Sequence, residues 1–118
     1  MDAELARTVC RLVAGLIVAD DDFAPEEEAF IERMLKRFGV PDRETIFPIL
    51  DRNEAAESVR SMPLALQQEA LATLIEAAAA DGTIADEERS YLHAVGEAMG
   101  LDDAAVDKLA AAALAGQK

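Results

Sequence analysis

The sequence predicts an all-α domain, and three observations support this fold class. Strand-forming residues are scarce: the chain has no tryptophan, aromatic residues make up 4%, and no sustained alternation of polar and apolar residues occurs. Alanine, leucine, glutamate and arginine, which favour helix, are abundant. Apolar residues recur at intervals of three and four. With 118 residues, 52% of them hydrophobic, residues 1–118 should form one domain with a buried core.

Helix-start and helix-stop signals divide the first half of the chain. An apolar stripe over Leu5–Ile17 predicts the first helix. Pro25 suits the first position of a second helix, and Gly39 follows its last apolar turn, where a helix-ending glycine belongs. A third helix is expected near Thr45–Phe47, broken or restarted by Pro48.

The second half carries signals of the same kind. Residues 53–63 resemble a short helical turn and linker, and Pro63 opens the fourth helix. Asp86–Glu88 place negative charge at the positive N-terminus of the next helix, and Gly100 should end it. Asp102 can then cap the final helix.

The chain contains an internal repeat. At an offset of 61, residues 19–42 align with residues 80–103 without a gap, and seven of the 24 positions are identical. We therefore divide the domain into a first repeat, 1–61, and a second, 62–118. Each repeat should contain a helix, an acidic loop, a second helix, a glycine stop and a third helix.

The charge balance restricts the possible partners. The 24 acidic residues exceed the 11 basic ones and give a net charge of −13. Binding to nucleic acid or to anionic lipid is therefore disfavoured, whereas cations and basic protein surfaces are favoured. A single cysteine, Cys10, excludes an internal disulfide framework. The N-terminus lacks a basic signal, and no apolar run reaches the ~18–20 residues of a membrane span. We expect a cytoplasmic protein without membrane insertion.

The two repeated loops are the strongest candidates for a functional site. Asp81, Gly82, Ile84 and Glu88 have the spacing of the second half of an EF-hand calcium loop. A complete EF-hand is excluded, because alanines occupy the places of its first ligands. Carboxylates from both loops could still gather around a hard cation, Ca²⁺, Mg²⁺ or Mn²⁺. The predicted ligands are Asp20, Glu27, Asp81 and Glu88, with Asp22, Glu26, Asp86 and Glu87 as secondary candidates.

A purely structural interpretation of the same residues stays open. Acidic side chains at helix N-termini commonly cap the helix or complement its dipole, for about 0.3–1 kcal/mol each. A duplicated helical hairpin would repeat such a pattern without binding any ion.

The phrase AAADGTIADEERSYLHAVGEAMGL, echoed by VADDDFAPEEEAFIERMLKRFGV, resembles the tellurite-resistance TerB-like family over nearly the whole chain. It is also similar to the N-terminal domain of some DnaJ-type membrane co-chaperones. The resemblance implies a compact bundle of about seven helices built from two repeats. It also implies that the acidic inter-helix loops bind metal, with Asp20, Glu27, Asp81 and Glu88 as site residues. Asp21 and Asp22 depart from the family's Gly-Thr in the first loop.

Other reactive side chains are few. His93, the only histidine, is predicted to lie on an exposed helix face, and Cys10 to be a small buried hydrophobic residue. No Ser/His/Asp or Cys/His set can be assembled without these two residues. We therefore expect no enzymatic activity.

The leading functional hypothesis is a non-enzymatic, TerB-like stress-response module that binds a divalent cation through its acidic inter-helix loops. The alternative is a metal-independent acidic helical scaffold for protein–protein interaction. Resemblance suggests a membrane-associated complex as its protein partner. A small hydrolase using paired carboxylates is a third hypothesis, and it would need a pocket with raised carboxyl pKa values.

Overall fold

The structure, a computed structural model, describes residues 3–17, 25–37, 39, 50–80 and 82–116; the side chains of Ala3, Leu5 and Glu27 fall outside this description. The described residues form six α-helices and contain no strand, which confirms the all-α prediction. The helices are α1 (Ala3–Ile17), α2 (Pro25–Arg37), α3 (Arg52–Arg60), α4 (Leu64–Ala78), α5 (Asp86–Ala98) and α6 (Asp103–Ala115).

The number of helices in the described part is six, against an expectation of about seven. The helix expected near Thr45–Phe47 lies outside the described residues. Residues 52–60 are a further difference, because they form a nine-residue helix, longer than the expected short helical turn and linker. The reason is local: the Asp51 carboxylate accepts the Glu54 backbone N–H at 2.8 Å, and the Glu54 carboxylate accepts the Asp51 N–H at 3.2 Å. This reciprocal capping box starts α3.

The other start and stop signals act as the sequence predicts. Helix α2 begins at Pro25, and Pro63 immediately precedes α4. Gly39 and Gly100 follow α2 and α5 with φ of 68° and 87°, a conformation that other residues rarely adopt. The Asp102 carboxylate accepts the Ala105 N–H at 2.8 Å and so caps α6.

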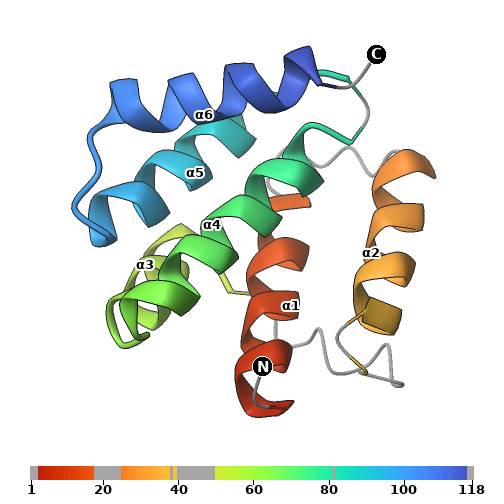
Figure 1. The fold of residues 1–118 in the computed structure, drawn as a ribbon, viewed down its shortest axis with the longest axis horizontal. Helices are drawn as coiled ribbons and strands as arrows, with labels where there is room; N and C mark the ends of the chain where they lie inside the picture. The colour runs from red at the N-terminus through yellow and green to blue at the C-terminus, as the bar shows by residue number, and fades with distance from the viewer. Residues whose placement is uncertain (1–2, 18–24, 38, 40–49, 81, 117–118) are drawn as a thin grey trace.

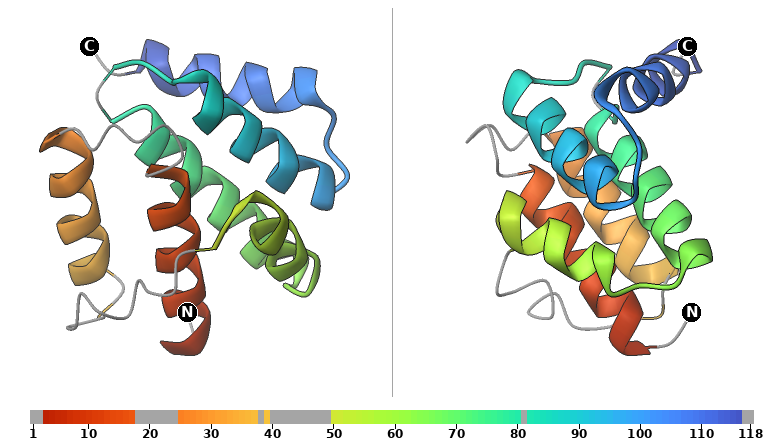
Figure 2. Two further views of the ribbon diagram at one scale, coloured as in Figure 1. Left: turned by 180° about the vertical axis from the view of Figure 1, so that it is seen from behind. Right: turned by 90° about the vertical axis from the view of Figure 1, so that its left-hand side faces the viewer.

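Helix α4 packs against all five other helices, and α1 packs against α2, α3, α4 and α5 (Figure 1). Helix α2 flanks α1 on one side, and α6 crosses over α4 and α5 (Figure 2). The core between these helices is aliphatic, and its largest fully buried side chains include Leu12, Leu16, Leu74 and Leu92. The radius of gyration of 12.8 Å is that of a compact domain.

The helix bounds follow the sequence repeat. Helices α1 and α4 both have 15 residues, and α2 and α5 both have 13. The offset that aligns the two halves of the sequence carries the bounds of α1 onto α4 and those of α2 onto α5. The counterpart of α6 in the first half would lie at residues 42–54, most of which fall outside the described ranges. The third helix of the first repeat therefore stays a prediction.

One close packing contact ties three distant segments together. The Tyr91 hydroxyl of α5 donates a hydrogen bond to the Leu50 carbonyl oxygen at 2.9 Å. Gly15 of α1 lies directly beneath this pair, and a Cβ atom there would overlap the Leu50 oxygen and lie 2.7 Å from the Tyr91 hydroxyl. Glycine at this position lets α1, α5 and the segment before α3 approach one another.

Candidate functional site

The two acidic loops are bounded by helix ends that lie at the same end of the bundle. The C-terminal ends of α1 and α4 and the N-terminal ends of α2 and α5 all lie there in the three views (Figures 1 and 2). Gly82 in the second loop has φ of 90°, which supports the tight loop expected from the sequence.

Among the four main predicted ligands, Glu88 is the one whose side chain the structure describes. It is buried, with 3% of its surface exposed, in the first turn of α5. Its Oε1 accepts the Ala85 backbone N–H at 3.1 Å. This bond satisfies an N–H group that the helix itself leaves without a partner. Glu88 therefore has a capping role, whether or not it also contacts an ion.

The structure does not show the other predicted ligands grouped around one position. Asp20, Asp22 and Asp81 lie outside the described residues, as does the side chain of Glu27. The secondary candidates Glu26, Asp86 and Glu87 are exposed. Within the described residues, no three His, Cys, Asp or Glu side chains form a group that could hold a metal. The four-carboxylate site remains a prediction.

His93 does not lie on an open helix face, so that expectation was wrong. Its side chain is 22% exposed between α5 and α6. Nε2 lies 2.7 Å from an Asp107 carboxylate oxygen, and Nδ1 lies 3.7 Å from an Asp103 oxygen. The two aspartates are four residues apart and therefore lie on one face of α6. This spacing is the sequence feature that could have indicated a shared partner. Because they contact different ring nitrogens, the three side chains do not converge on one metal position.

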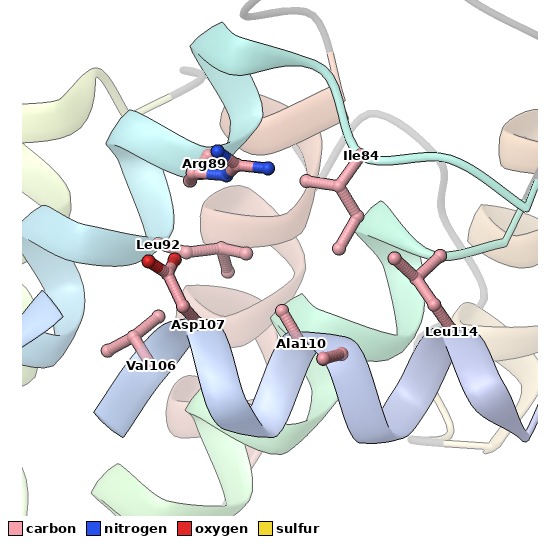
Figure 3. A pocket seen from close by; sticks show the side chains of 8 residues that line it. Ile84, Arg89, Leu92, Val106, Asp107, Ala110 and Leu114 are labelled. Carbon is pink, nitrogen blue, oxygen red and sulfur yellow. The ribbon is translucent and has the colours of Figure 1, made fainter. Parts of the chain in front are cut away.

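A small pocket of about 230 Å³ lies between α5 and α6 (Figure 3). Arg89 extends over it from α5, and Asp107 approaches it from α6. The other lining residues are apolar: Ile84, Leu92, Val106, Ala110, Ala111 and Leu114. Sequence reasoning did not find this pocket, because its two charged residues come from different helices.

A larger hollow of about 520 Å³ lies between α4 and α6. Its lining is mostly aliphatic and includes Leu71, Ile75, Met99 and Leu109. Leu109 is 47% exposed there, one of the two large hydrophobic side chains in the described part that face solvent. Glu76 lies on its edge, 3.8 Å from Arg37.

Cys10 is a buried residue of the core, as the sequence predicts. Cys10 is fully buried, and burial raises the pKa of its thiol from 9.0 to about 11. Because the thiolate is the reactive form, Cys10 should be chemically inert in the native state. Burial and the nearby carboxylates of Asp51 and Glu54 also raise the pKa of the Tyr91 phenol.

These raised pKa values predict a loss of stability at alkaline pH. Above pH 9 the unfolded chain loses the Cys10 proton before the native protein does, so the free energy of unfolding falls until about pH 11. A shift of this size is worth about 2–3 kcal/mol. Urea unfolding at pH 8 to 11 measures it, and Cys10→Ala should lose less stability over the same range. Parallel curves for the two proteins would contradict the assignment to Cys10.

No protein-family model, curated protein or solved structure matches this sequence. No helix in the described ranges has the length and hydropathy needed to cross a membrane. Fold and charge together define a small, strongly acidic, all-helical domain.

Proposed function

We propose that this chain is a non-enzymatic, TerB-like stress-response module of the tellurite-resistance type, which binds a divalent cation through its acidic inter-helix loops. The observation that carries the proposal is the placement of four helix ends. The helix ends that flank the two acidic loops belong to α1, α2, α4 and α5, and all four lie at one end of the bundle (Figures 1 and 2). The shared helix bounds at the repeat offset add support.

The mechanism is charge neutralisation. Carboxylates gathered from two loops repel one another, and a hard cation with oxygen ligands relieves that repulsion. Binding would fix the α1–α2 hairpin relative to the α4–α5 hairpin. The ion would thereby change the surface that the module presents to a protein partner.

Ion-dependent thermal unfolding tests the proposal. We expect one of Ca²⁺, Mg²⁺ or Mn²⁺, at 100 times its dissociation constant, to stabilise the wild type by about 2.7 kcal/mol relative to EDTA. For a domain of this size the midpoint should rise by several degrees. Zn²⁺, which prefers nitrogen and sulfur ligands, should stabilise less. All samples need matched ionic strength, because salt alone screens an acidic surface.

Two double variants make the test specific. The variant Asp81→Asn/Glu88→Gln should abolish the stabilisation by the ion. The control Glu57→Gln/Glu97→Gln also removes two negative charges, but from exposed positions outside the loops, so it should still be stabilised by the ion. An equal response to every ion, or an unchanged response in Asp81→Asn/Glu88→Gln, would show general screening and would exclude the site.

The second candidate is a metal-independent acidic scaffold for protein–protein interaction. The hollow between α4 and α6 favours it, because Leu109 is exposed beside a mostly aliphatic lining. A partner with a basic surface would complement the net charge of −13. An absence of any ion-specific stabilisation would favour this scaffold over the cation-binding module.

A further inference from the structure

The pocket between α5 and α6 combines two opposite charges with an apolar wall. Arg89 on α5 and Asp107 on α6 face it from different helices, and Ile84, Ala110 and Leu114 line its other end (Figure 3). The Leu92 and Val106 side chains are almost fully buried and form its base. A ligand with one positive group, one negative group and an aliphatic body would match this arrangement.

Arg89 is available to bind an anion. Its side chain is exposed, and among the described residues it makes no hydrogen bond or ion pair, so Arg89 and Asp107 do not neutralise each other. A guanidinium presents a planar pair of N–H donors that matches the two oxygens of a carboxylate.

Asp107 is held in place from outside the pocket. His93 contacts its Oδ1 at 2.7 Å, which orients the carboxylate. The side chain is nevertheless 49% exposed and lines the pocket. A carboxylate oriented in this way can accept N–H groups from an ammonium.

We propose that this pocket binds a small aliphatic α-amino acid in its zwitterionic form. The ligand's carboxylate pairs with Arg89, its ammonium group pairs with Asp107, and its side chain packs against Ile84, Ala110 and Leu114. A simple carboxylic acid would place its negative charge beside the Asp107 carboxylate with no ammonium group to offset it, and a simple amine would place its positive charge beside Arg89. The volume of about 230 Å³ is below the ~300–1,000 Å³ of pockets for drug-sized ligands and suits a molecule such as leucine.

This inference is independent of the cation proposal, so its test is made in EDTA. L-leucine is added to the full ¹⁵N-labelled chain, and backbone amide shifts are followed by NMR. We expect shift changes confined to the pocket residues, with a dissociation constant of about a millimolar or below. Isocaproate, which lacks the amino group, and isoamylamine, which lacks the carboxylate, should each bind at least ~10-fold more weakly.

Matched variants identify the charged partners. Arg89→Gln and Asp107→Asn should each weaken leucine binding at least ~10-fold, and Ala110→Phe should abolish it by filling the pocket. Lys108→Gln and Glu97→Gln remove one positive and one negative charge at exposed positions outside the pocket lining and should bind leucine normally. The charged residues are exposed, so these variants should fold, which circular dichroism checks. The proposal would be overturned if leucine caused no shifts, if either analogue bound as tightly as leucine, or if the control variants weakened binding as much as Arg89→Gln and Asp107→Asn.

Discussion

Replacing Gly15 with alanine is expected to destabilise the protein by about 3 kcal/mol. The added Cβ would overlap the Leu50 carbonyl oxygen and crowd the Tyr91 hydroxyl, which are hydrogen-bonded to each other. Backbone atoms cannot move aside as a flexible side chain can, so α1 would have to shift away from this contact. Helix propensity alone favours alanine over glycine by about 1 kcal/mol, so the sign of the effect is set by tertiary packing.

Urea unfolding of the Gly15→Ala variant measures this effect, with Gly116→Ala as the matched control. Gly116 has a φ of −79° at the end of α6, and a Cβ there would meet nothing closer than 3.6 Å. The control should therefore stay within about 0.5 kcal/mol of wild type. Equal stability of the two variants would show that the contact beneath Tyr91 does not constrain α1.

Replacing Leu74 with alanine is expected to cost roughly 3–5 kcal/mol. Leu74 lies in the middle of α4 and is fully buried in the core. Removing its side chain loses apolar burial and leaves a cavity that the surrounding helices fill only in part. Because a domain of this kind is stable by about 5–15 kcal/mol, this single change would remove a large share of the total.

Leu64→Ala is the control for this experiment, because it makes the same chemical change in the same helix. Leu64 is 65% exposed at the start of α4, so its truncation should change the free energy of unfolding by no more than about 0.5 kcal/mol. Both values come from urea unfolding at one temperature. Similar losses for the two variants would place Leu74 outside the packed core.

Helix starts and stops were predictable wherever their causes lie within a few residues. Pro25 begins α2, Gly100 follows α5 with positive φ, and Asp102 caps α6. The capping box of α3 is equally local, because it is formed by Asp51 and Glu54. From the sequence, only a short helical turn and linker were predicted there. In each case the cause lies within one turn of the helix end: a proline without an N–H group, a glycine with positive φ, or a carboxylate that accepts a helix N–H group.

The candidate sites differ in how far the sequence could predict them. The sequence repeat identified the acidic loops, and the helix ends around them lie together, but most of the predicted ligands fall outside the described residues. The pocket between α5 and α6 could not be predicted, since Arg89 and Asp107 lie on separate helices with no periodic signal linking them. The position of His93 was missed because its partners, Asp103 and Asp107, lie on another helix.

The sequence by itself determined the helical class, the bounds of most helices and the acidic character of the protein. These properties depend on local backbone preferences, apolar spacing and the sum of the charges. Only the tertiary structure decided which residues meet across helices. Gly15 admits the Leu50–Tyr91 contact, and Gly96 lets α6 approach α5 closely enough for Val106 to pack against it. Close approach between distant segments depends on the shapes of both surfaces, which no single stretch of sequence contains.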